Sequence, residues 1–167
     1  MTDQGAETET GRAMFDELLW VHGMIRSDLG VVRRLADDVA AGLSPAGVQA
    51  GIDALKTSGP LWRLKINCLR YCRFVHSHHH FEDEMWFPTL RSFNPAIHPV
   101  IDRLEEDHRK VSVLLDDVER LAAALTHAEN TAARTDLAAA LGELATHLLA
   151  HLEYEEENAG PTIRRMP

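Results

Sequence analysis

A nine-residue stretch, from His76 to Glu84 (HSHHHFEDE), holds four histidines and three acidic residues. Neutral imidazole and carboxylate groups are good ligands for iron, manganese and zinc. A segment so rich in them either forms a charged face in contact with water, or turns some of these side chains inward to hold a metal. The two cases differ in whether the histidines and acids fall in phase with the apolar residues of a helix.

Four segments of the chain carry apolar residues at helical spacing. They cover about residues 11–41, 61–87, 99–126 and 131–157, and a shorter helix-forming segment covers 46–57. Glycine and proline residues separate them, and we expect Pro88 to end the second long helix. No segment has the alternation of a strand, so the sequence predicts an all-α fold, an antiparallel up-down four-helix bundle. We expect one domain over residues 1–167, with residues 1–10 as a flexible N-terminal tail.

Each of the four long helices has a histidine at a position where its apolar stripe predicts a leucine. These residues are His22, His108, and the pairs His78–Glu82 and His151–Glu155. Four-residue spacing puts both members of a pair on one helix face, one turn apart. Burying such groups without a partner is costly, and metal ligation removes that cost. Four imidazoles and two carboxylates suit two metal ions with bridging glutamates better than one four-coordinate zinc.

The second helix leaves one alternative open. A rotation by one position would make His79 and Asp83 the inward pair instead of His78 and Glu82. We expect the other charged residues of the stretch to meet water, namely His76, His80 and Glu84. We expect the same of the acidic run 153–157, apart from Glu155.

These residues resemble the hemerythrin-like (HHE cation-binding) family. The stretches LLWVHGMIRSDL, HHHFEDEMWFP, RLEEDHRKV and HLLAHLEYEEENAGP look like its four helices in order and spacing, and the resemblance covers nearly the whole chain. It implies an up-down bundle around a non-haem centre of two iron ions with an oxo or hydroxo bridge. Carried over by position, the implied ligands are His22, His78, Glu82, His108, His151 and Glu155.

Two positions depart from the oxygen-carrying members of that family. Those members have His-x-x-x-His on the third helix, where this chain has His108 and Ser112. They also have an aspartate five residues after the fourth-helix histidine, where this chain has Glu156, with Glu155 at four. The expected count is therefore four histidines rather than five, which leaves an open position or room for a substitute ligand. The candidates for that substitute are Tyr71 and His147.

Composition limits the partners. The net charge of −9 argues against nucleic acid or an anionic membrane, and no apolar run approaches the ~20 residues that span a bilayer. The polar, acidic N-terminus is unlike a presequence, and Cys68 and Cys72, one helical turn apart, are poorly placed for a disulfide. We therefore expect a cytoplasmic protein.

The resemblance is closer to bacterial members with two His-x-x-x-Glu units, which are linked to iron storage or repair and to nitric oxide and peroxide responses. We expect a di-iron protein that reacts with or senses O2, H2O2 or NO, with a catalase- or peroxidase-like activity as its enzymatic form. The alternatives are a non-catalytic iron- or oxygen-binding, storage or repair module, and a zinc-stabilised bundle. The ligand would be a small diatomic molecule or a peroxide, and any signal would pass through a protein partner.

Overall fold

The computed structural model describes residues 5–41, 60–125 and 131–167. Within these ranges the long helices are α1 (Glu9–Ala40), α3 (Pro60–Phe81), α5 (His98–Ala123) and α6 (Thr131–Asn158). Shorter elements are a π-helical turn η1 (Glu82–Trp86), α4 (Phe87–Phe93), a 3-10 turn η2 (Pro95–Ile97) and α7 (Gly160–Ile163). Every element of the described residues is helical, which confirms the all-α prediction. The segment 46–57, predicted as a short helix, lies outside them.

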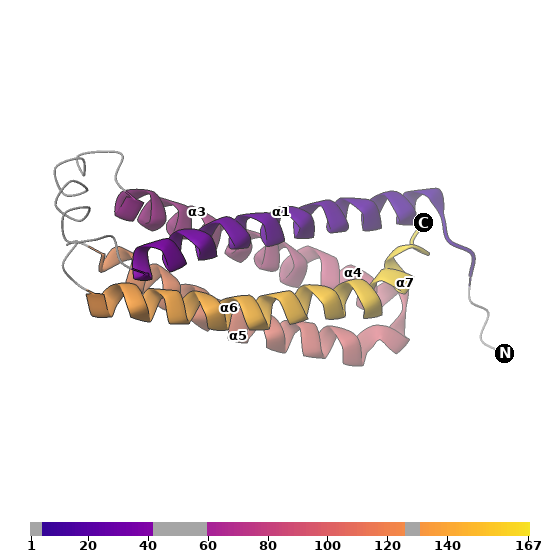
Figure 1. Cartoon of the computed structure of the whole chain (residues 1–167). Helices are drawn as coiled ribbons and strands as arrows, with labels where there is room; N and C mark the ends of the chain where they lie inside the picture. Colours follow the sequence, from indigo (N-terminus) through magenta and orange to yellow (C-terminus); the bar gives the residue numbers. More distant parts are fainter. Residues whose placement is uncertain (1–4, 42–59, 126–130) are drawn as a thin grey trace.

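The long helices lie side by side as a bundle (Figure 1), in which α1 and α5 each pack against both α3 and α6. Their apolar stripes meet in two buried clusters. The larger cluster includes Ile25, Leu64, Leu115 and Leu141, and the smaller one is built around Phe87, Leu90, Ile101 and Ile163. Along α1, Leu18 belongs to the smaller cluster and Ile25 to the larger, with His22 between them. The predicted histidines thus lie in a polar layer between two apolar ones.

Pro88 does not end the second helix, contrary to our expectation. The chain passes from α3 through the π-helical turn into α4, which continues to Phe93 and ends at Asn94. In η1 the amide of Phe87 bonds to the carbonyl of Glu82, five residues back. A proline lacks an amide hydrogen and its ring crowds the carbonyl four residues before it. Here that carbonyl belongs to the wider π-helical turn, so the chain accommodates the proline without leaving the helix.

The N-terminal end of α1 is fixed against the C-terminal segment. The Thr8 hydroxyl caps α1 by accepting from the amide of Gly11 at 2.8 Å, and the Thr8 amide donates to the carbonyl of Arg164 at 2.9 Å. A Cβ on Gly11 would lie 2.4 Å from that same Arg164 oxygen, so only glycine permits this approach. The helix therefore begins inside the range 1–10 that we expected to be a tail, while residues 1–4 lie outside the described chain.

No helix in the described ranges combines the length and apolar character needed to cross a membrane.

Candidate metal centre

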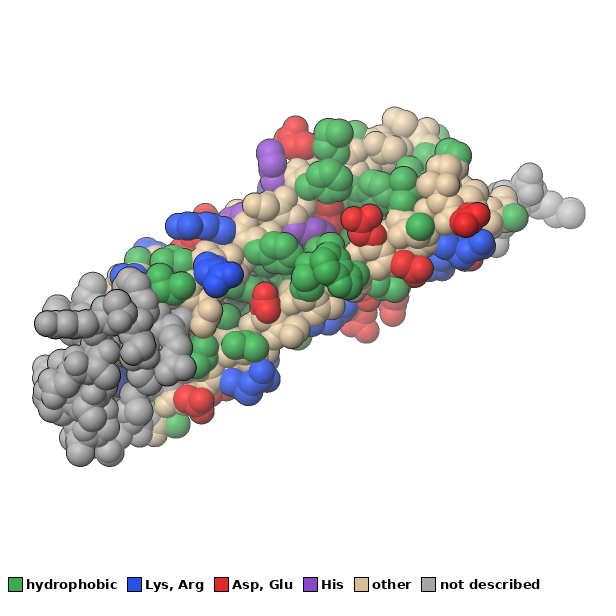
Figure 2. Space-filling model, turned by 90° about the horizontal axis from the view of Figure 1, so that it is seen from above, with side chains coloured by type: hydrophobic (Ala, Val, Ile, Leu, Met, Phe, Trp, Pro, Cys, Tyr) green, Lys and Arg blue, Asp and Glu red, His purple; other side chains and the backbone are tan. Residues whose placement is uncertain are grey.

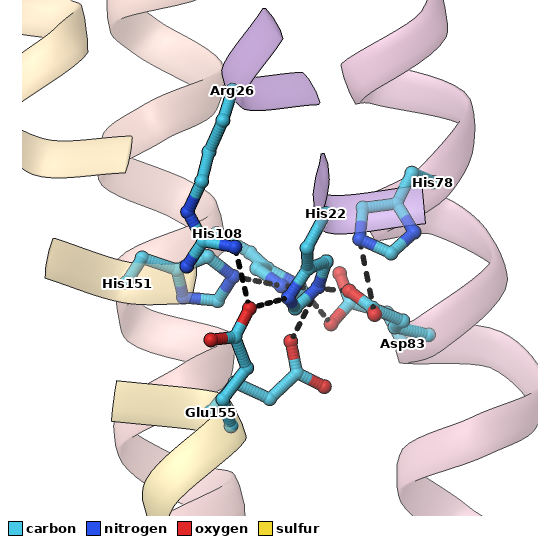
Figure 3. Close-up of polar contacts among 9 residues, drawn as sticks. His22, Arg26, His78, Asp83, His108, His151 and Glu155 are labelled. Atoms are coloured by element: carbon cyan, nitrogen blue, oxygen red, sulfur yellow. Dashed lines mark hydrogen bonds and ion pairs between the residues drawn. The ribbon is translucent and has the colours of Figure 1, made fainter. Parts of the chain in front are cut away.

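Seven side chains converge in the polar layer between the two apolar clusters. They come from every long helix and from η1, and are His22, His78, His79, Glu82, His108, His151 and Glu155. They form two overlapping groups, and within each group the possible ligand atoms all lie within 4.8 Å of one another. One group is His79, Glu82, His108 and His151; the other is His22, His78, Glu82 and Glu155. Figure 3 shows the labelled members pointing toward one small volume from different helices.

Glu82 belongs to both groups, and its two oxygens face different ones. Its Oε1 lies 3.2 Å from Nε2 of His78, and its Oε2 lies 3.3 Å from Nε2 of His108. The Glu155 carboxylate contributes from the opposite helix, with Oε2 3.3 Å from Nε2 of His22. A carboxylate whose two oxygens face separate sets of imidazoles has the geometry needed to bridge two cations.

The sequence left His78 and His79 as alternatives, and the structure brings both to the cluster. Neighbouring residues of an α-helix point about 100° apart, so each can face a different group across the bundle. The His78 ring lies edge-on to that of His22 on α1, with 5.3 Å between centroids. The His79 ring stacks on that of His108 on α5, with centroids 4.0 Å apart. The cluster therefore contains a fifth imidazole beyond the four that we expected.

Two further carboxylates lie behind the histidines. Nδ1 of His108 donates to Oδ1 of Asp83 at 2.8 Å, and Nδ1 of His22 donates to Oε1 of Glu156 at 2.8 Å. Because the carboxylates accept on the Nδ1 side, each ring in its neutral form would present the lone pair of its Nε2 to a cation in the cluster. The Arg26 guanidinium donates to the same Glu156 oxygen at 2.7 Å, and Figure 3 shows the Arg26 side chain reaching toward the cluster.

The sequence analysis missed this role of Asp83 and Glu156. We considered Asp83 only as an alternative inward residue, and we expected Glu156 to be solvated. The sequence did contain a signal. In both halves of the chain an acid directly follows the inward glutamate, as Glu82-Asp83 and as Glu155-Glu156.

Burial shifts the pKa values of several side chains in the cluster away from their usual range. Burial raises the pKa of the Glu82 carboxyl to about 8, and the negative charge of Glu155 adds to that shift. Burial lowers the pKa of His78 and of His151 to about 3. Burial also disfavours a charged His108, but its interactions with the Asp83 and Glu82 carboxylates outweigh this and raise its pKa to about 9.

The cluster is left with polar atoms that lack partners. Of the ten buried side-chain nitrogen and oxygen atoms without a hydrogen bond in the described residues, eight belong to His22, His78, His79, Glu82, His151 and Glu155. An unpaired buried carboxylate or imidazole is costly, and a cation placed among them would supply the missing interactions. The donor set, imidazole nitrogen and carboxylate oxygen, therefore fits a pair of transition-metal ions.

The other candidate residues have different surroundings. His147 is exposed on α6. Tyr71 is buried on α3 and lines a separate pocket with Asp28 and Phe74. The remaining charged residues of the opening stretch lie as expected, since His80 and Glu84 are exposed and His76 lies 3.4 Å from the exposed Asp116. Cys68 and Cys72 are free, buried thiols of the larger apolar cluster.

Comparison with curated proteins and with solved structures finds no match. Comparison with protein families does find one, because the model of the hemerythrin HHE cation binding domain matches residues 13–163. This range contains all seven converging side chains together with Asp83 and Glu156. The chain therefore belongs to the hemerythrin HHE cation-binding family.

Proposed function

We propose that the chain is a non-haem di-iron protein that reacts with or senses O2, H2O2 or NO, with decomposition of peroxide as its enzymatic form. The bundle is the antiparallel up-down arrangement expected from the sequence. The proposed ligands of the two iron ions, with an oxo or hydroxo bridge between them, are His22, His78, Glu82, His108, His151 and Glu155, with His79 as a further ligand.

The observation that carries this proposal is the position of Glu82. Its carboxylate is 1% exposed and shared by two groups of potential ligands, with one oxygen toward each. A single four-coordinate zinc would use one such group and leave the buried imidazoles of the other unpaired. A pair of ions bridged by Glu82 uses both.

The surrounding residues set the conditions for redox chemistry. Bound iron supplies one- and two-electron exchange with small oxygen or nitrogen oxide molecules. Asp83 and Glu156 fix the ring orientations of His108 and His22, and such outer carboxylates also make imidazole a stronger electron donor. The apolar clusters on both sides of the polar layer limit its contact with water.

The two groups differ in composition, which favours reaction at one of them. One has three imidazoles and one carboxylate, whereas the other has two imidazoles and two carboxylates. His78, which belongs to the second group only, lines a surface pocket between α1 and α3 together with the shared Glu82. We therefore propose that small ligands approach from the side of His78.

The same proposal places the protein in a reducing compartment, the cytoplasm. Cys68 and Cys72 are free thiols, and their burial raises both pKa values, that of Cys68 to about 12. Buried thiols of raised pKa are structural rather than reactive.

The test is the iron content of the purified chain followed by peroxide kinetics. We expect about two iron ions per chain, an absorption band of the oxidised iron pair in the visible range, and loss of that band on reduction. Many peroxide turnovers per iron pair identify an enzyme, whereas a single turnover that then stops identifies a sensor or a storage module. One zinc ion per chain, or no bound metal, would refute the di-iron proposal.

A further inference from the structure

A pocket of about 420 Å³ lies between α1 and the α3–η1 segment and ends at the metal centre. Its inner end is formed by His78 and by Glu82, and its outer part includes the exposed residues Glu17, Ser77 and Phe81. Figure 2, which looks onto the face of α1 and α3, shows hydrophobic side chains gathered near the middle of the molecule with a histidine among them. A pocket of this volume is far larger than a diatomic molecule or hydrogen peroxide requires, and lies in the range that holds small organic ligands.

The pocket walls are mostly apolar. Six of the ten lining residues are Met14, Leu18, Val21, Phe74, Phe81 and Trp86. Phe81 is 57% exposed, an unusual position for a large aromatic side chain at the edge of a buried polar site. Such walls favour a hydrocarbon body, because its transfer from water is favourable by about 25 cal/mol per Å² of apolar area.

Charge restricts the ligand further. No lysine or arginine is among the residues that line the pocket, while the exposed Glu17 lies at its outer part. The whole chain carries a net charge of −9. An organic anion would therefore meet the carboxylate of Glu17 at the mouth and find no cationic side chain to pair with, whereas an uncharged molecule needs no such partner.

Trp86 supplies the polar recognition. Its indole Nε1 is buried and has no hydrogen-bond partner, while its side chain lines the pocket. Indole N–H groups are donors only, and buried ones usually find an acceptor. Because this nitrogen is buried, the indole would have to turn toward the pocket for an oxygen atom of a ligand to provide that acceptor.

We infer that this pocket binds an uncharged organic molecule with a hydrocarbon body and one oxygen head group, of the alcohol and hydroperoxide type. The hydrocarbon lies against the walls formed by α1 and α3, and the oxygen accepts from Trp86 at the end next to the metal centre. This inference rests on the proposed function, since it extends the peroxide substrates of that centre from hydrogen peroxide to organic hydroperoxides.

The test uses cumyl alcohol, which has the hydrocarbon body and oxygen head but no peroxide bond and does not react. Its binding to the metal-loaded protein is measured by calorimetry, and the contact residues by chemical-shift changes on a zinc-loaded sample. Ser77→Trp fills the outer part of the pocket. Its matched control is Ser92→Trp, because both serines are exposed on a helix and their hydroxyls donate to the carbonyl four residues back, at 2.9 and 3.0 Å.

We expect saturable one-to-one binding that Ser77→Trp weakens at least tenfold and Ser92→Trp leaves unchanged. Trp86→Phe, which keeps the aromatic wall and removes the donor, should weaken binding about fivefold, the usual net worth of a neutral hydrogen bond. Its control is Trp20→Phe, since Trp20 is 65% exposed and does not line the pocket.

The outcomes separate this inference from the proposed function. Absence of saturable binding, or equal binding by Ser77→Trp and Ser92→Trp, overturns the pocket assignment even when the protein holds two iron ions. Equal binding by Trp86→Phe and Trp20→Phe overturns the role of the indole. Metal analysis of the same samples tests the di-iron centre independently, because the pocket walls come from α1, α3 and η1 and not from a metal.

Discussion

Replacing Glu82 by glutamine tests the centre of the reasoning. Among the described residues, Glu82 is the member common to both ligand groups, with its oxygens 3.2 Å from His78 and 3.3 Å from His108. Glutamine keeps the size and shape of the side chain but removes the charge and the second equivalent oxygen. Each group then loses its bridging carboxylate, so we expect metal content to fall from about two ions per chain toward zero.

The structure also predicts different metal contents for variants of the neighbouring histidines. His79 belongs to one group only, so His79→Gln leaves the other group, with His22 and Glu155, complete. We expect about one ion per chain for this variant. His76, a partly exposed histidine three residues before His79 on α3, lies outside both groups. His76→Gln should therefore bind as much metal as the unchanged protein.

The assay is elemental analysis after loading with excess ferrous iron and removal of unbound metal. Thermal unfolding with and without a chelator gives a second measure, since a ligand at 100 times its Kd adds about 2.7 kcal/mol to the free energy of unfolding. Glu82→Gln should lose this chelator-sensitive increment, and His76→Gln should keep it. Equal metal content in Glu82→Gln and His76→Gln would refute the assignment of Glu82 as the bridge. Equal loss in His79→Gln and Glu82→Gln would show that the two groups do not fill separately.

Three further predictions follow from the same structure. Glu156→Gln should weaken metal binding by about 10- to 100-fold in a competition titration, as the loss of an outer carboxylate does, whereas Glu157→Gln on the exposed side should not. Metal uptake at pH 7 should release protons, because burial raises the pKa of the metal-free Glu82 carboxyl to about 8. The affinity for metal should therefore rise as the pH is raised through that value. Calorimetry in buffers of different ionisation enthalpy measures the number of protons released. Gly11→Ala should lower the free energy of unfolding by about 1–3 kcal/mol in denaturant titration, since its Cβ would lie 2.4 Å from a backbone oxygen, whereas Gly142→Ala, with no atom within 4 Å, should be neutral or stabilising.

Helical periodicity was sufficient to predict the inward side chains of the long helices. His22, His108 and His151 were placed by their phase with leucine, isoleucine and valine, and each is now found buried, at 3% exposure or less. The same reasoning placed Glu82 and Glu155, which are 1% and 0% exposed. A stripe of period 3.6 fixes the direction of every side chain on a regular helix, so this part needed no tertiary information.

The inward-facing side chains of the second helix could not be predicted in this way. Periodicity alone allows only one of His78 and His79 to occupy the inward position. In the bundle, His78 faces α1 and His79 faces α5, so both are used, and the choice between them depends on where neighbouring helices lie. The π-helical turn that starts at Glu82 changes the phase of the residues after it, and its wider hydrogen-bonding pattern lets the helix continue past Pro88.

The outer carboxylates reveal how the two halves of the chain support each other. Each half ends its inward pair with two acids, and the second acid bonds to a histidine of the other half: Asp83 to His108, and Glu156 to His22. The two interactions have nearly equal lengths but unequal charge, because Arg26 donates to Glu156 whereas Asp83 has no arginine contact among the described residues. His108 is therefore held by the less compensated carboxylate, which would make it the stronger electron donor to a bound metal. In the proposed centre, the group with three imidazoles would then be better suited to a higher metal charge, and a ligand would exchange at the group that contains His78, beside the pocket.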